Sequence, residues 1–485
     1  MLKVKGVKIN YILNITRTVL STLIGLLIFP YINKTLGVQA VGKYEYANSI
    51  ITYFILFSSL GIPMYGIREI AKVRDSEKKR TEVVLELLAI LFITTIISYL
   101  FFFFLILYTD GVSNYKELLL IISPTIFLTS IGLEWFFQGI EDQLYITVRF
   151  LIVKIITLVL LFTMVNNSDD LLIYAGIMAF SLGGSNIFNF FYIRKFLNFS
   201  QVKYKELDIK RHFKGVLTIF LATISISIYI QLDTTLLGYY AGDKYVGLYT
   251  TANKLVRFAI LFVTTLGAVM LPRLSYLYEN NQKEEYYNYL EKSFKYILFF
   301  SVPIVVLLYS LSDSIIYIMA GEEFAESVVS MKILSSLVLV IGLAYFLAFM
   351  VLYPQGKERL YTIIVFITAL ISLFLNVYFI PKYFHIATSW VNLSVEIIAV
   401  VIMMLITRKE LKRIKCFNIT NLYYFIGGII MFFLVDLLKI FIENVWITII
   451  TTSILGGLIY VAFLLLVKEK TLLEVVYKLK QKIKQ

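Results

Sequence analysis

The chain has 485 residues, of which 59% are hydrophobic and 16% are charged, and its mean hydropathy is +0.82. Soluble chains are about 45–50% apolar and about 25% charged, so this composition excludes a soluble domain and indicates an integral membrane protein. The net charge of +13 in such a protein indicates basic loops beside the anionic inner leaflet rather than a nucleic-acid partner.

Residues that would indicate an enzyme or a metal site are scarce. Cys416 is the only cysteine, so no intramolecular disulfide is expected. The two histidines, His212 and His385, fall in what the sequence marks as polar connections. No nucleotide-binding motif is present. We therefore expect no enzyme, no metal site and no cofactor other than a coupled H+ or Na+.

Apolar segments long enough to cross a bilayer, about 20 residues each, follow one another along the chain. The sequence predicts an all-α polytopic membrane protein, because a spanning backbone must satisfy its own hydrogen bonds. The fourteen predicted spans are 9–34, 41–64, 82–108, 118–139, 144–165, 171–193, 214–239, 246–271, 294–319, 328–352, 360–380, 386–407, 421–442 and 445–467. The last two are separated only by the sequence ENV.

Basic residues are distributed unevenly between the two sides of these spans. The N-terminus, the even-numbered connections and the tail hold 34 of the 45 Lys and Arg residues, and the other side holds about seven. Because positive charge favours the cytoplasmic side, we predict that both termini are cytoplasmic. The tail 468–485 alternates apolar and basic residues and is expected to lie on the inner leaflet as an amphipathic helix.

One short stretch occurs twice. Residues 41–48 read VGKYEYAN and residues 246–253 read VGLYTTAN, at the start of the second and eighth spans. We therefore predict two parallel-repeat lobes of six helices around a central cavity. The predicted divisions are an N-lobe at 1–205, a C-lobe at 206–410, two additional helices at 411–467 and the basic tail.

Polar and charged residues inside the predicted spans are the candidate binding residues. A buried Arg or Lys costs about 2.5–3.5 kcal/mol on insertion scales, so each must face water or a partner. Arg17 and Asn14 share one face of the first span, which carries no acid, so we expect Arg17 to have no folding partner. The seventh and eighth spans supply the remaining candidates, Gln231, Asp233, Asn253, Lys254 and Arg257.

Several of the charged residues inside the predicted spans have two possible roles each. Asp233 is the candidate for binding a coupled ion, but Lys254 could simply neutralise it. Lys154 could extend toward the membrane surface or line the cavity. Arg149 could pair with Glu134 or Glu141, which with Gln138 form a stripe for which a structural network is the favoured role. Arg149, Lys154 and Glu134 are secondary candidates for the binding site. Glu86 has no evident partner.

Several stretches resemble the repeat-unit flippases of the polysaccharide biosynthesis family, often called Wzx, within the MOP exporter superfamily. The resembling residues are FPYINKTLG at 29–37, VGKYEYANSIITYFILFSSLGIPMYGIREIA at 41–71, LEWFFQGIEDQLYITVR at 133–149, and Asp233 followed by VGLYTTANKL at 246–255. The stretch 133–149 is the most specific of them. The resemblance covers the first twelve spans and, more loosely, the last two.

The resemblance implies a transporter in the bacterial cytoplasmic membrane. Such proteins move undecaprenyl-diphosphate-linked oligosaccharides from the inner to the outer leaflet, with membrane lipids, and in some pathways a polymerase and chain-length machinery, as partners. The related flippase for the peptidoglycan precursor uses arginines in its first and eighth spans, which implies diphosphate-binding roles for Arg17 and Arg257. A monomer is expected.

Two alternatives remain at this stage. A cation-coupled drug antiporter of the same superfamily would have an acid-dominated cavity, contrary to Arg17, Lys254 and Arg257. A membrane polysaccharide polymerase would need a large external loop, and the outward connections are short.

Overall fold

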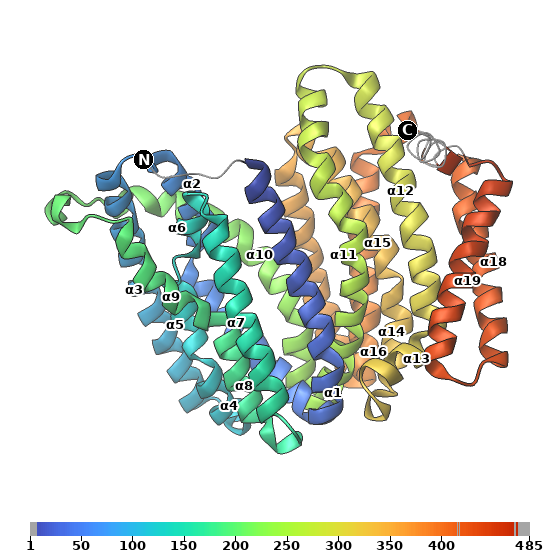
Figure 1. The fold of residues 1–485 in the computed structure, drawn as a ribbon, viewed down its shortest axis with the longest axis horizontal. Helices are drawn as coiled ribbons and strands as arrows, with labels where there is room; N and C mark the ends of the chain where they lie inside the picture. The colour runs from blue at the N-terminus through green and yellow to red at the C-terminus, as the bar shows by residue number, and fades with distance from the viewer. Residues whose placement is uncertain (1–6, 415, 417, 470–471, 474–485) are drawn as a thin grey trace. The chain divides into compact units, whose positions relative to one another are not determined.

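The structure is a computed structural model that describes residues 7–414, 416, 418–469 and 472–473. Within these residues all regular structure is helical (Figure 1), which confirms the predicted all-α class. The chain divides into two compact units, Met1–Gly247 and Leu248–Gln485, and each is described by itself. The predicted amphipathic tail lies almost entirely outside the described residues.

The first unit is built from ten helices and the start of an eleventh, in the part of the chain that the structure describes. They are α1 (Val7–Ser59), α2 (Ile62–Val73), α3 (Glu77–Tyr108), α4 (Lys116–Ile122), α5 (Pro124–Ser130), α6 (Glu134–Gly139), α7 (Gln143–Met164), α8 (Leu171–Ala179), α9 (Ser185–Tyr192), α10 (Lys210–Ala241) and α11 (Asp243–Glu279). A π-helical turn at Phe180–Gly184 joins α8 to α9. Helix α10 packs against α1 and α2, so it groups with the N-terminal helices, whereas the sequence repeat assigns it to the second lobe. The repeat-based lobes stay a prediction.

The second unit contains the rest of α11 and the remaining helices. They are α12 (Lys283–Ser310), α13 (Ser312–Met319), α14 (Ser327–Ser335), α15 (Leu337–Tyr345), α16 (Glu358–Ile406), α17 (Arg408–Arg413), α18 (Ile419–Phe441) and α19 (Val445–Leu466). The short break predicted at ENV is confirmed. Helix α18 ends before it, and the Asn444 side chain caps α19 by accepting from the backbone N–H of Trp446 and Ile447 at 3.0 and 3.2 Å.

Two helices are too long to be single spans. Helix α1 has 53 residues, about 80 Å at 1.5 Å per residue, against a hydrocarbon core about 30 Å thick. Its backbone breaks at Gly37, with φ 75° and ψ 172°, between the predicted spans 9–34 and 41–64. Helix α16, with 49 residues, also breaks, at Phe384 with φ 52° and ψ −133°, between the predicted spans 360–380 and 386–407.

All fourteen predicted spans fall on helical structure. By length and composition alone, ten of the described helical segments could cross a membrane, or eleven if the bent pair Gly111–Ile122 and Pro124–Gly139 forms one span. The broken helices α1 and α16 each count once in that number, although each covers two predicted spans. Helix α10 is not among the ten. The count of fourteen therefore stays a prediction.

The repeated stretch adopts one backbone conformation at both of its occurrences. Gly37 has φ 75° and ψ 172°, and Gly242, which is 205 residues later, has φ 90° and ψ 177°. A side chain would be strained at both positions, which explains why both are glycine. Each glycine ends one helix and starts the next, so the sequence repeat encodes the same sharp corner twice.

The two corners also contact each other reciprocally. A methyl group at Gly42 would overlap the backbone carbonyl of Asp243, and one at Gly247 would overlap that of Val38. Positions 42 and 247 are equivalent in the repeat, as are positions 38 and 243, so the same contact is made in both directions. Such self-complementary contact is characteristic of an isologous interface. The structure thus gives a packing reason for both repeated VG pairs.

Candidate arginine–carboxylate site in the first unit

Glu134 is presented by a sharp turn between α5 and α6. Leu133, immediately before it, adopts a left-handed conformation with φ 53°. Gly132 has no room for a side chain, because a methyl group there would overlap the Asn186 amide, and its carbonyl accepts a hydrogen bond from the Asn189 side chain. The turn is therefore fixed by close packing against α9.

The rest of the LEWFFQG stretch anchors this turn. Trp135, Phe136 and Phe137 are at most 4% exposed and belong to one hydrophobic core built mainly from α2, α3 and α6. The Trp135 ring lies where a methyl group at Gly66 would be, so α2 and α6 pack closely. Three buried aromatic residues in succession hold α6 in one orientation and leave the Glu134 carboxylate facing α1 and α7.

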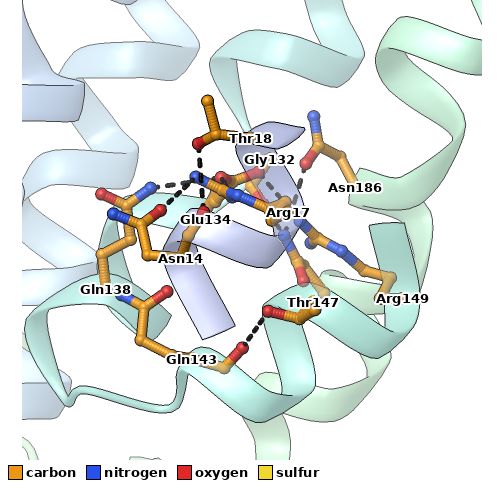
Figure 2. A network of polar contacts seen from close by, with 11 residues as sticks. Asn14, Arg17, Thr18, Gly132, Glu134, Gln138, Gln143, Thr147, Arg149 and Asn186 are labelled. Atoms are coloured by element: carbon orange, nitrogen blue, oxygen red, sulfur yellow. Dashed lines mark hydrogen bonds and ion pairs between the residues drawn. The ribbon is translucent and has the colours of Figure 1, made fainter. Parts of the chain in front are cut away.

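The Glu134 carboxylate binds two arginines at once (Figure 2). Its Oε1 accepts from Arg17 Nη1 on α1 at 2.9 Å, and its Oε2 accepts from Arg149 Nη2 on α7 at 2.8 Å. Gln138, one turn later, donates to Oε1 at 3.1 Å. The residues come from positions 17, 134 and 149, and the fold brings them together at one carboxylate.

The two arginines differ sharply in burial. The Arg149 side chain is 4% exposed, whereas Arg17 is 24% exposed and Glu134 is 36% exposed. Arg149 also lies over the Tyr145 ring, 5.7 Å from its centroid. Its Nε and Nη1 atoms are buried and have no hydrogen-bond partner among the described residues. One carboxylate thus faces two cations, and the more buried cation is the less satisfied one.

These contacts change two expectations. The prediction that Arg17 has no folding partner is wrong, because its partner comes from a helix 117 positions further along the chain. Of the two partners predicted for Arg149, the structure selects Glu134, while Glu141 accepts from Arg74 at 2.8 Å. The predicted structural network around Glu134 and Gln138 is present. Asn14 joins it through a long 3.5 Å contact with Arg17 Nη2.

Lys154 lies further along α7. Its Nζ donates to Ser181 Oγ at 2.7 Å, in the π-helical turn, and lies 5.7 Å from the centroid of the Phe150 ring. The partner is a neutral hydroxyl, so the structure provides Lys154 with a hydrogen bond and a ring contact rather than an ion pair, as far as the described residues show.

The predicted residues of the seventh span lie on α10. Asp233 is buried, at 5% exposure, and Gln231 is half-buried. Two residues after Asp233, the Thr235 hydroxyl contacts the Ser49 and Tyr53 hydroxyls on α1 at 2.9 and 3.2 Å. This part of α10 therefore presents polar groups to α1.

The predicted residues of the eighth span lie on α11, in the second unit. Lys254 is exposed, and Asn253 and Arg257 are half-buried. The pairing of Asp233 with Lys254 and the binding role of Arg257 stay predictions.

A second buried charged cluster was missed by sequence reasoning. Glu86 on α3 is 2% exposed and accepts from the Arg211 guanidinium, from His212 Nε2 at 2.8 Å and from the Asp208 backbone N–H at 2.8 Å. His212 Nδ1 is 2.9 Å from the Tyr65 hydroxyl. Local sequence patterns could not predict that Glu86 binds His212, which is 126 residues away. The assignment of both histidines to polar connections is also wrong, because His212 and His385 are buried within helices.

Comparisons with known proteins agree with this fold. The lipid II flippase MurJ in an inward closed conformation has a TM-score of 0.68 and 20% identity, covering 93% of this chain and 98% of that one. An inward-facing multidrug resistance MATE transporter of the MOP superfamily has a TM-score of 0.61 and 12% identity, covering 81% and 99%. The chain is therefore a multi-pass helical membrane protein that shares the fold of these two proteins.

Sequence matches define the family more narrowly. The chain matches the family described as polysaccharide biosynthesis protein over residues 7–278 and the family described as MatE over residues 218–378. The first match covers more than half of the chain, so the chain belongs to the polysaccharide biosynthesis protein family, as the resemblance predicted.

Two of the relatives have names that refer to bacterial surface polysaccharides. A protein named as an O-antigen transporter in Escherichia coli (strain K12) is 21% identical over 394 residues, which are 81% of this chain and 94% of that protein. The capsular polysaccharide biosynthesis protein CapF of Staphylococcus aureus is 24% identical over 375 residues, which are 75% and 90%.

Proposed function

We propose that this protein is a flippase that moves undecaprenyl-diphosphate-linked oligosaccharides from the inner to the outer leaflet of the bacterial cytoplasmic membrane. The family membership, the O-antigen and capsule relatives and the flippase fold support this proposal. In this proposal both termini are cytoplasmic and the protein works by alternating access without catalysing a reaction. The lipid tail stays in the bilayer while the headgroup crosses.

The observation that carries the proposal is the Arg17–Glu134–Arg149 cluster. Two guanidinium groups inside a membrane protein share one carboxylate, so the ion pairs of the described residues leave this cluster with one more positive than negative charge. Guanidinium groups offer planar, paired donors that suit phosphate oxygens. A diphosphate headgroup is the substrate chemistry that such a cluster favours. We also propose that Arg257 on α11 contacts the diphosphate, together with Asn253 and Lys254. This role is inferred from the related flippase, which uses an arginine in its eighth span.

Ion coupling is a separate part of the proposal. Asp233 is a buried carboxylate on a membrane helix, and such residues commonly mark ion pathways. We propose that it exchanges H+ or Na+ during the transport cycle. If Lys254 is instead its permanent partner, changing both Asp233→Asn and Lys254→Gln should restore transport that either change alone reduces.

The direct test is transport by the purified protein. Proteoliposomes would carry a fluorescent undecaprenyl-diphosphate oligosaccharide, and a glycosidase added outside would report which headgroups have crossed. We expect exchange with the native protein and strongly reduced exchange with Arg17→Ala. The matched control is Arg74→Ala, which removes a partly exposed arginine paired with Glu141 at 2.8 Å in the same unit. Exchange no faster than in protein-free liposomes would refute the proposal.

The MatE match and the MATE fold favour one alternative, a cation-coupled drug antiporter. The same proteoliposomes can be loaded with a cationic dye. Dye export without movement of the lipid-linked sugar would replace the flippase proposal with the antiporter.

A further inference from the structure

Two nitrogen atoms of the Arg149 guanidinium lack an acceptor in the part of the chain that the structure describes. Only Nη2 binds Glu134, while Nε and Nη1 are buried and have no hydrogen-bond partner among the described residues. A buried donor without an acceptor costs about 1–3 kcal/mol. The side chain is 4% exposed, so bulk water does not readily supply the missing acceptors. The Arg149 guanidinium can therefore bind more acceptor oxygens than Glu134 provides.

The geometry of Glu134 explains why it cannot provide more acceptor oxygens. A carboxylate has two oxygens, and each is already used, Oε1 by Arg17 and Gln138 and Oε2 by Arg149. If both oxygens turned onto the Arg149 guanidinium, Oε1 would move away from Arg17 and Gln138. A phosphate or diphosphate group carries more oxygens and more negative charge, and it could engage paired donors on both arginines.

We propose that Glu134 is an internal substitute for the substrate's diphosphate, which the arriving headgroup displaces from Arg17 and Arg149. The inference rests on the proposed function, because it identifies how that same site accepts and releases its ligand. In the empty site Glu134 keeps the two guanidinium groups in place. In the loaded site the diphosphate takes both of them.

The structure also supplies what a displaced Glu134 needs. The carboxylate is 36% exposed, so water can solvate it when it leaves the arginines. Gln138 lies one helical turn away and already donates to it at 3.1 Å, which provides a neutral partner that remains after displacement. When Glu134 returns to the arginines it competes with the bound headgroup, which favours its release.

Competition makes a prediction that a purely structural role does not. If Glu134 competes with the ligand, removing its charge strengthens diphosphate binding; if it only positions the arginines, removing its charge weakens binding. The probe is inorganic diphosphate, titrated into the full-length protein in lipid nanodiscs and followed by calorimetry and by thermal stability. Glu134→Gln should bind at least about tenfold more tightly than the native protein, the equivalent of one charge-assisted contact.

Two further variants complete the test. Glu134→Asp keeps the charge but is one methylene shorter, so it should hold one arginine less well and bind diphosphate with intermediate affinity. Glu141→Gln removes a carboxylate of the same stretch that pairs with Arg74, and it should leave the affinity unchanged. Since Glu134→Gln also leaves Arg149 without its anion, diphosphate should stabilise this variant against heat more than it stabilises the native protein.

The outcomes separate this inference from the proposed function. Equal or weaker diphosphate binding by Glu134→Gln overturns the inference, and so does an equal gain in the Glu141→Gln control. If Glu134→Gln does not fold, equal or weaker binding by Glu134→Asp decides against it. The inference alone is overturned if the native protein transports the lipid-linked substrate but diphosphate affinity does not rise from native to Glu134→Asp to Glu134→Gln. The proposed function alone is overturned if these affinities follow the predicted order but the native protein does not transport the lipid-linked substrate.

Discussion

Arg17 and Glu134 are partners, yet replacing each of them with alanine should lower the stability of the protein to a different extent. Replacing Arg17 with alanine leaves Glu134 bound to Arg149 and Gln138. The lost pair is partly exposed, 24% for Arg17 and 36% for Glu134, and exposed pairs contribute about 0–1 kcal/mol. We therefore expect Arg17→Ala to lower stability by no more than about 1 kcal/mol.

Replacing Glu134 with alanine leaves Arg149, at 4% exposure, without an anion. Breaking a buried pair in this way costs about 3–5 kcal/mol. Glu134 is itself partly exposed, and the Tyr145 ring still faces the guanidinium, so we expect a loss near the lower limit, about 3 kcal/mol. The stability order is therefore native, then Arg17→Ala, then Glu134→Ala.

Transport by Arg17→Ala should fall much further than its small loss of stability would suggest. Losing one charge-assisted phosphate contact costs about 1.5–3 kcal/mol, or roughly ten- to a hundredfold, so Arg17→Ala should export far less polysaccharide from nearly normal amounts of protein. Arg17→Lys should recover part of it, because lysine keeps the charge but loses the planar fork.

The assay pairs thermal unfolding of the purified variants with surface polysaccharide per unit of membrane-inserted protein, and Arg74→Ala is the control. Two results would refute the reasoning. One is Arg17→Ala unfolding as readily as Glu134→Ala. The other is Arg17→Ala exporting as much as the control.

Three other predictions follow from single positions. Asp233→Asn should slow export more than it weakens binding of the lipid-linked substrate, and equal losses in both would argue for a structural role. Gly42→Ala should destabilise the protein, since a methyl group would overlap the Asp243 carbonyl, whereas Gly457→Ala, which meets nothing within 4 Å, should be neutral or stabilising by up to about 1 kcal/mol; unfolding temperatures test both. Ser200→Cys should react with an impermeant maleimide only from the cytoplasmic side and Glu322→Cys only from outside, and the reverse pattern would contradict the predicted topology.

The sequence by itself determined the helical membrane class and the family. Each depends on information that is local in the chain: an apolar run long enough to cross a bilayer, a polar break such as ENV, or a stretch such as LEWFFQGIEDQLYITVR. The repeat at 41–48 and 246–253 could also be found, because it needs only a comparison of one part of the sequence with another. Gly37 and Gly242 occupy equivalent positions of this repeat, and the structure shows the sharp corner that explains them.

Only the tertiary structure decided which charges meet. Helical periodicity relates residues three or four apart, and it correctly placed Gln138 beside Glu134. It could not find Arg17 for Glu134, at a separation of 117 residues, or His212 for Glu86, at 126. Those pairs depend on how α1, α6 and α7, or α3 and α10, pack against one another. Packing is set by buried aromatic residues such as Phe136 and Phe137, whose partners are spread over the chain, and so the ligand-competing role of Glu134 emerges only from the folded protein.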